Sequence, residues 1–291
     1  MLVRFITFGE NPAVVIARGR GLFASRGLEV ETTITRSSTE QMRGLSAGTY
    51  DVASTAFDNV LAWSGREGAD IHAVAQASQR MSLPVYVRPE IGDWDDLRGR
   101  TLAVDAVDTA YALVLRRILL AHGLDLDRGD YRLDGVGATG PRFESMKSGK
   151  TFAGILNPPW DKQAEAAGLK RMADYREVLP DYPGGVFAVT TRWAGAHRDE
   201  LVAFLKCLTE AAGWGNDPAN RADALGLLRE AQGIDDERAA KELAALPPAT
   251  DLNLTGLQVP LDLRVSFGMP PGKGTDLAAY YDLHYHAEAA A

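Results

Sequence analysis

Cysteine is almost absent from this chain of 291 residues, which contains only Cys207. A single thiol excludes an internal disulfide and any metal cluster held by several thiolates. Apolar residues recur around Cys207 at helical spacing: Leu201, Phe204, Leu205 and Leu208. Because this spacing is typical of a buried helix face, we expect Cys207 to be a small core residue rather than a nucleophile.

Positive charge is also scarce. The chain has 31 Lys and Arg against 39 Asp and Glu, which gives a formal net charge of −8, and its basic residues are scattered. Binding to nucleic-acid phosphates or to an anionic membrane surface needs clustered Lys and Arg. We therefore expect no nucleic-acid partner and no basic membrane-surface patch.

Long apolar runs are missing as well. None reaches the roughly 18 residues that a membrane span needs, so we expect no membrane insertion. Leu2–Phe8 follows Met1 directly and has the pattern of a folded strand, not of a signal peptide. The chain as written is therefore expected to be cytoplasmic, or periplasmic if a leader has been removed.

The first part of the chain alternates strand and helix patterns. Strands are expected at Leu2–Phe8, Leu28–Thr35, Asp51–Thr55 and Ile71–Ala77. Asn11 before Pro12 is typical of a helix start, and this helix is expected to run to about Arg26. Such an order predicts an α/β fold with a largely parallel sheet and right-handed crossovers.

Ligands of such sheets bind beyond the carboxyl ends of the strands, where the helices begin. Two helix starts there carry capping-box patterns, Ser38 with Gln41 and Thr55 with Asp58. An alternative role for Phe57 and Asp58 is structural, as a buried ring and a helix cap. The candidate ligand-binding residues of this region are Phe8, Asn11, Ser38, Phe57, Asp58, Asn59 and Gln79.

A second α/β unit follows Leu83-Pro84. Its expected strand Thr101–Val104 leads into a helix over Thr109–His122, with Asp108 as its cap and Asp105, Thr109 and Tyr111 as candidate ligand-binding residues. Asn157 and Trp160 follow a later strand across a Pro-Pro turn, and Trp160 is interpreted either as a cleft wall or as a core plug.

Two extended crossings, near Pro84–Val87 and Gly185–Val189, predict that the second unit is inserted into the first. We expect residues 1–84 and 186–291 to form lobe 1 and residues 85–185 to form lobe 2. The predicted fold has two mixed sheets flanked by helices, with the two crossing strands as a hinge.

Two motif matches carry no prediction. Gly135–Gly140 fits a dinucleotide-binding pattern, but Pro141 follows it and the next strand ends in Asn157 instead of an acid. Asp282, His284 and His286 alternate without a fourth ligand. We therefore expect no cofactor and no metal.

Three runs, in this order along the chain, resemble a known family: GLFASRGLEV at Gly21–Val30, LSAGTYDV at Leu45–Val52 and WDDLRGRTLAV at Trp94–Val104. They are similar to the substrate-binding proteins of ABC importers, in the nitrate, sulfonate, taurine and thiamine-precursor (NMT1/THI5-like) branch. The likeness covers roughly residues 1–215. It implies a type II periplasmic-binding-protein fold whose two lobes close on a small molecule.

The resemblance further implies a small-molecule ligand and an ABC permease as partners, for a protein that is a monomer or a weak dimer. Sulfonate binders typically present small hydroxyl or Gly residues at the start of the second-lobe helix, where this chain has Asp105 and Asp108. These acids, with Asp58, favour a cationic or donor-rich ligand that is polar or partly aromatic.

An alternative function is a cytoplasmic enzyme on the same scaffold. A decarboxylase or another carbon–carbon bond enzyme would use the carboxylates of Asp58 and Asp105 for acid–base chemistry. The expected cleft offers no well-placed His, Cys or Lys, which favours a binding protein without catalytic residues. A ligand-sensing regulatory module is the third alternative.

Overall fold

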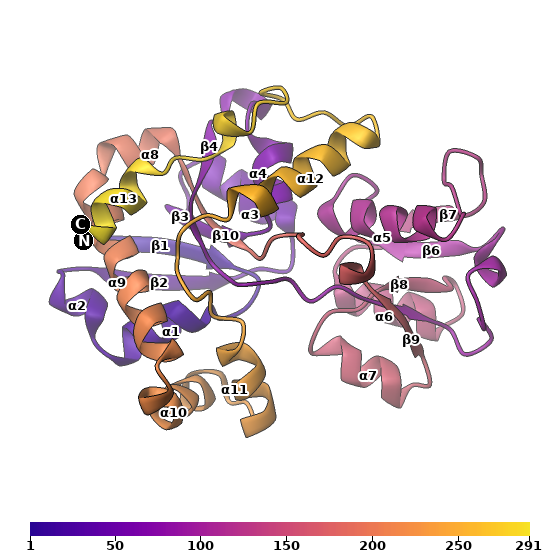
Figure 1. Cartoon of the computed structure of the whole chain (residues 1–291), viewed down its shortest axis with the longest axis horizontal. Helices are drawn as coiled ribbons and strands as arrows, with labels where there is room; N and C mark the ends of the chain where they lie inside the picture. Colours follow the sequence, from indigo (N-terminus) through magenta and orange to yellow (C-terminus); the bar gives the residue numbers. More distant parts are fainter. The chain divides into compact units, whose positions relative to one another are not determined.

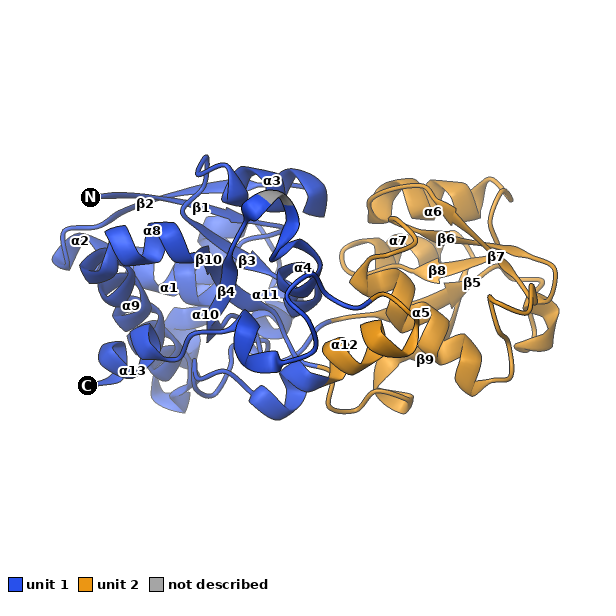
Figure 2. Ribbon diagram, turned by 90° about the horizontal axis from the view of Figure 1, so that it is seen from above, with its two compact units in different colours: residues 1–81, 183–258, 270–291 blue, residues 82–182, 259–269 orange. Residues whose placement is uncertain are grey.

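The computed structural model describes residues 1–291, except for the side chain of Glu67. The chain divides into two compact units (Figure 2). Unit 1 comprises Met1–Met81, Pro183–Gln258 and Pro270–Ala291, and unit 2 comprises Ser82–Tyr182 and Val259–Met269. The segment Val259–Met269, which the sequence analysis assigned to lobe 1, thus clusters with unit 2.

Unit 1 contains a mixed sheet with the strand order β2-β1-β3-β10-β4 (Figure 1). Its strands are β1 (Leu2–Thr7), β2 (Glu29–Ile34), β3 (Val52–Thr55), β4 (Ile71–Gln76) and β10 (Val186–Thr190). β1 pairs in parallel with β2 and β3, while β10 runs antiparallel between β3 and β4. The carboxyl ends of β1 to β4 therefore lie at one edge of the sheet.

The helices of unit 1 include α1 (Pro12–Gly19), α2 (Leu22–Ser25), α3 (Ser38–Ser46), α4 (Phe57–Trp63), α8 (Thr191–Ala196), α9 (Arg198–Asn216), α10 (Arg221–Gln232), α11 (Asp236–Leu243) and α13 (His284–Ala290). The expectation of one helix from Pro12 to about Arg26 is wrong. Gly21 has a φ of +69°, a left-handed conformation that ends the helical path and separates α1 from α2.

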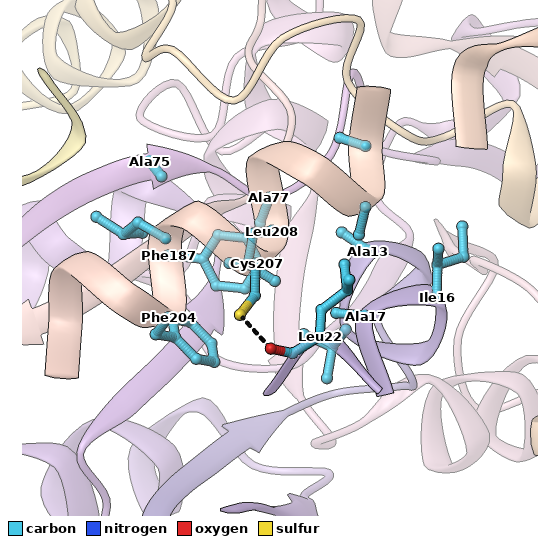
Figure 3. Close-up of a cluster of buried hydrophobic side chains, with 14 of the residues drawn as sticks. Ala13, Ile16, Ala17, Leu22, Ala75, Ala77, Phe187, Phe204, Cys207 and Leu208 are labelled. Atoms are coloured by element: carbon cyan, nitrogen blue, oxygen red, sulfur yellow. Dashed lines mark hydrogen bonds between the residues drawn. The ribbon is translucent and has the colours of Figure 1, made fainter. Parts of the chain in front are cut away.

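The core of unit 1 lies between its sheet and the helices α1 and α9 (Figure 3). Phe5, Phe187 and Phe204 are fully buried in it, and burial of each ring stabilises the fold by about 1.5–3 kcal/mol. Cys207 lies in the same cluster, where its thiol donates a 3.3 Å hydrogen bond to the carbonyl of Leu22. Its prediction as a core residue is confirmed.

Unit 2 contains a second mixed sheet, with the strand order β7-β6-β8-β5-β9. Its strands are β5 (Pro84–Val87), β6 (Thr101–Val104), β7 (Arg132–Gly135), β8 (Ala153–Ile155) and β9 (Lys170–Asp174). Its helices are α5 (Ala110–Ala121), α6 (Thr139–Lys147) and α7 (Trp160–Ala166), and helix α12 (Leu254–Ser266) has residues in both units. The predicted α/β class with two mixed sheets flanked by helices is confirmed.

Among the described residues, no helix combines the length and the apolar composition that a membrane span requires.

Candidate functional site

Three parallel strands of unit 2 end side by side. β6 pairs with both β7 and β8, and Val104 at the end of β6 lies opposite Gly135 at the end of β7. The loops that leave these ends lead into α5, α6 and α7. Because ligands of α/β sheets bind at such carboxyl ends, these loops form the candidate site of unit 2.

Arg142 of α6 joins two of these loops. Its side chain is 3% exposed. Nε donates to the carbonyl of Ile155 at 3.1 Å, and Nη1 donates to the carbonyl of Gly137 at 3.1 Å. Nη2 donates to Oγ1 of Thr139 at 2.8 Å. A single buried guanidinium therefore connects the end of β8 to the loop after β7.

The charge of Arg142 is compensated within the site. Nη1 lies 3.9 Å from Oδ1 of Asp105, and the guanidinium carbon lies 5.0 Å from the centre of the Tyr111 ring. Burial lowers the pKa of Arg142, while Asp105 and Tyr111 act in the opposite direction. Arginine stays protonated in proteins, so Asp105 faces a permanent cation.

Thr109 is the N-cap of α5. Its Oγ1 accepts a hydrogen bond from the amide of Ala112 at 3.4 Å and donates one to Oδ1 of Asp105 at 2.5 Å. The expectation that Asp108 caps this helix is therefore wrong. Thr109 has the extended backbone of an N-cap, with φ −92° and ψ 164°, which places its short side chain within reach of the first-turn amides.

Asn157 and Trp160 lie beside α6. Oδ1 of Asn157 accepts a 2.6 Å hydrogen bond from Thr139. The ring of Trp160 lies 5.7 Å from that of Phe143, centre to centre, and packs against Gly140. Trp160 is partly buried against the core of unit 2, so it contributes to packing while part of its surface remains accessible.

The N-terminus of α6 has no side-chain cap, and its first turn contains no acidic residue. The amides of Thr139 and Gly140 stand at the first two helical positions, where a helix supplies no acceptor for them. An electron-rich group placed there would be stabilised by these donors and by the helix dipole.

Unit 2 thus brings together four residues named from the sequence: Asp105, Thr109, Tyr111 and Asn157. Sequence reasoning missed Thr139 and Arg142, which connect them. The signal was available, because the glycine-rich segment Gly135–Gly140 follows a strand and precedes a helix at the same sheet edge. This segment is a loop that carries Thr139 to the site and not a dinucleotide motif alone.

In unit 1, Asn11 caps α1. Its Oδ1 accepts hydrogen bonds from the amides of Ala13 and Val14, and its Nδ2 donates to the carbonyl of Ala77 at 2.9 Å. The predicted helix start at this residue is therefore confirmed. These bonds join the start of α1 to the end of β4, so Asn11 shapes this sheet edge.

The start of α4 differs from the expected capping box. The N-cap is Ala56, which makes no side-chain bond, and Thr55 instead accepts a 2.9 Å hydrogen bond from Nδ2 of Asn59. Thr55 stands one residue before the N-cap and bonds a side chain of the first turn instead of a backbone amide. Phe57 and Asp58 are both 1% exposed, which places an aromatic ring and a carboxylate inside unit 1.

The start of α3 is displaced by one residue from its prediction. Ser37 is the N-cap, because its extended backbone directs Oγ to the amide of Glu40 at 3.2 Å. Ser38 therefore occupies the first helical position and is partly exposed. The predicted capping box of Ser38 with Gln41 is wrong.

Phe8 and Gln79 lie at the ends of β1 and β4, and both are exposed. Within the described part of the chain, no hydrogen bond or ring contact joins Phe8, Ser38 or Gln79 to Phe57. Gln76, which the sequence analysis missed, is buried and donates to the carbonyls of Ser78 and Gly185. Unit 1 therefore aligns its candidate residues along one edge without connecting them as unit 2 does.

Unit 2 also has a hollow away from these residues. It has a volume of about 410 Å³ and lies between α5 and α12. Its lining includes Leu120, Leu179, Leu263 and Phe267. None of the candidate site residues is among those that line it.

Comparison with known sequences gives a family and one curated relative. The model of the NMT1-like family matches residues 2–229. The bicarbonate transport ATP-binding protein CmpC of Synechocystis is 26% identical over 240 residues, which cover 75% of this chain and 35% of that protein. The chain thus spans about a third of the length of this relative.

Comparison with solved structures gives matches over nearly the whole chain. The periplasmic nitrate-binding protein NrtA of Synechocystis PCC 6803 has a TM-score of 0.80 at 15% identity, over 99% of this chain and 87% of that one. The alkanesulfonate-binding protein SsuA of Xanthomonas axonopodis pv. citri, bound to MOPS, has a TM-score of 0.76 at 18% identity, over 96% and 98%. The chain therefore has the fold of periplasmic binding proteins and belongs to the NMT1-like family.

Proposed function

We propose that this chain is the solute-binding component of an ABC import system and binds a small polar, partly aromatic molecule. Membership of the NMT1-like family and the likeness to NrtA and SsuA support this proposal. The ligand-binding set comprises Phe8, Asn11, Ser38, Phe57, Asp58, Asn59, Gln79, Asp105, Thr109, Tyr111, Asn157 and Trp160. Thr139 and Arg142 complete it.

The observation that carries the proposal is the polar network around Arg142. A buried charge and several buried polar groups are costly to desolvate, and a fold retains them where their hydrogen bonds are satisfied or where they serve a site. Here the guanidinium organises three strand ends and leaves the α6 amides and one oxygen of Asp105 for a ligand. These groups offer both donors and acceptors to a small molecule.

The ligand need not be a cation. Oδ1 of Asp105 already lies 3.9 Å from Nη1 of Arg142 and accepts a hydrogen bond from the hydroxyl of Thr109. The uncapped α6 amides favour an acceptor on the ligand, and the rings of Tyr111 and Trp160 favour a flat portion. We therefore propose a ligand that combines a hydrogen-bond acceptor or negative group with a planar part.

The test is a thermal-shift screen of the full chain against polar metabolites, followed by calorimetry. A ligand that binds only the folded state adds about 2.7 kcal/mol of stability at one hundred times its Kd. Thr139→Val is expected to weaken binding about tenfold or more, because it leaves groups of Arg142 and Asn157 without a partner. Thr255→Val, at an exposed position on α12, is the matched control.

The fate of the ligand separates binding from catalysis. We expect the bound molecule to be recovered unchanged after prolonged incubation. Turnover that disappears with Asp58→Asn or Asp105→Asn would instead establish an enzyme. A broad screen without any stabilising compound would contradict the solute-binding function.

A further inference from the structure

We infer that Arg264 of α12 is a positioning residue for the unit 2 site, because it holds the loop that carries Asp105 and Thr109. The meaning of this role for ligand binding rests on the proposed function. The contact between Arg264 and Asp108 is independent of that function. It gives the segment Val259–Met269 a structural role in unit 2. The match to the NMT1-like family model ends at residue 229, before this segment begins.

The first observation is a hydrogen bond between distant parts of the chain. Arg264 is 3% exposed, and its Nη2 donates to the carbonyl of Asp108 at 2.7 Å, across 156 residues of sequence. Asp108 directly precedes Thr109, the N-cap of α5. Hydrogen bonds from a charged donor are roughly twice as strong as neutral ones, so this carbonyl is held firmly.

The second observation is an independent contact further along α5. The guanidinium carbon of Arg116 lies 4.1 Å from the ring centre of Phe267. Arg116 is 5% exposed, and such stacking is worth more where water is excluded. The segment therefore contacts α5 at two places, one at the loop before its N-terminus and one about two turns into the helix.

The consequence for the site follows from Thr109. Its hydroxyl bonds Asp105 on one side and the Ala112 amide on the other, so a displacement at Asp108 is passed to both. Oδ1 of Asp105 in turn lies 3.9 Å from Nη1 of Arg142. Arg264 thus fixes the position of the acid and of the α5 cap, without belonging to the loops of the site.

The experiment measures amide hydrogen exchange in the full-length chain without ligand. Arg264→Met is expected to speed exchange about tenfold at Ala112 and Leu113, whose amides bond Oγ1 and the carbonyl of Thr109. Arg264→Lys keeps a charged donor and is expected to restore most of the protection. Amides of Thr101–Val104 in β6, a strand paired on both sides within unit 2, report the stability of that unit and should not change.

The matched control is Arg229→Met, which removes an exposed arginine whose Nη1 bonds Asp236 within unit 1. If Arg264→Met does not fold, Arg264→Gln retains a neutral donor and is expected to speed exchange at the same amides by about threefold. Phe267→Leu removes the other contact and should speed exchange near Arg116 first.

Two results decide the inference. Unchanged exchange at Ala112 and Leu113 in a folded Arg264 variant would overturn it. Faster exchange there, reversed by lysine, supports it even if no ligand is ever found, so its failure is distinct from that of the proposed function. Once a ligand is known, Arg264→Met should raise Kd about tenfold while Arg264→Lys stays within about twofold of the parent.

Discussion

The hydroxyl of Thr139 lies 2.6 Å from Oδ1 of Asn157 and donates a hydrogen bond to it. Thr139 follows β7 and Asn157 follows β8, the two strands that flank β6. The bond therefore spans the end of β6, where Asp105 begins its loop. The hydrogen bond thus places polar groups from the ends of β6, β7 and β8 next to one another.

Gly140 provides a test of the packing beneath that surface. A Cβ at this position would lie 2.8 Å from Cζ2 of Trp160. Gly140→Ala is therefore expected to displace the indole and to destabilise the fold by about 1–3 kcal/mol. Tryptophan fluorescence and urea unfolding would measure both effects.

The matched control for Gly140 is Gly226→Ala in α10, where a Cβ meets nothing within 4 Å. Since alanine is the better helix former, this variant should gain about 0.5–1 kcal/mol. Equal effects of the two substitutions would contradict the tight contact at Trp160.

Gly184 should tolerate no side chain. A Cβ there would lie 1.8 Å from the carbonyl oxygen of Ser78. This oxygen belongs to the backbone, so no side-chain rotation can relieve the clash. Gly184→Ala is expected to lower the free energy of unfolding by about 3 kcal/mol or more, beyond the usual range for overpacking. Gly195→Ala has open space around its Cβ and serves as the control in a chemical denaturation series.

The pH dependence of the free energy of unfolding should include a contribution from the protonation of His72. Its Nε2 lies 3.2 Å from Nζ of Lys273, an arrangement in which the ammonium donates and the imidazole must be neutral. Burial lowers the pKa of His72, and Lys273 lowers it further, while Asp70 and Asp282 oppose this. The hydroxyl of Thr191, also next to His72, donates a hydrogen bond to Oδ2 of Asp70.

A lowered folded-state pKa means that protonation favours the unfolded chain. The contribution of His72 is therefore present above about pH 6.5, the usual value for the unfolded state, and is lost as the pH falls toward the folded pKa. Unfolding midpoints between pH 8 and 5, chosen to span about 1.5 units on either side of that value, should fall less for His72→Gln than for the parent chain.

Cys207 should be inert in the native protein. Burial raises the pKa of its thiol to about 11, and its Sγ donates a hydrogen bond to the carbonyl of Leu22. Only the thiolate is nucleophilic, so a disulfide reagent at pH 8 should react no faster than the chain opens. Rapid labelling without denaturant, measured against the rate in urea, would contradict the buried position.

The sequence was sufficient for the order of the strands β1 to β4, because local signals are strong there. β1 and β4 are short runs of mainly apolar residues, and Asn11 before Pro12 marks the start of α1. Three of the errors concern helix caps: Ser37, Ala56 and Thr109 occupy N-cap positions at which a neighbour was expected. Capping depends on φ and ψ at one residue, which residue types alone do not specify.

The site was only partly predictable for a different reason. Strand ends identify Asp105, Thr109 and Asn157, since the chain direction in an α/β unit follows from the alternation itself. No sequence pattern indicated the role of Arg142. That role depends on the pairing of β8 with β6, which brings the carbonyl of Ile155 within hydrogen-bond distance of the guanidinium. Likewise, Phe57 proved to be buried, which depends on what packs over it.

By itself the sequence determined the α/β class, the order of β1 to β4 and the edge of each sheet at which helices begin. These properties depend on hydrophobic period and on local backbone preference, both of which are encoded within short windows. The tertiary structure decided which side chains meet. Arg264 reaches Asp108 across 156 residues, and only the packing of α12 against α5 could bring those two groups together.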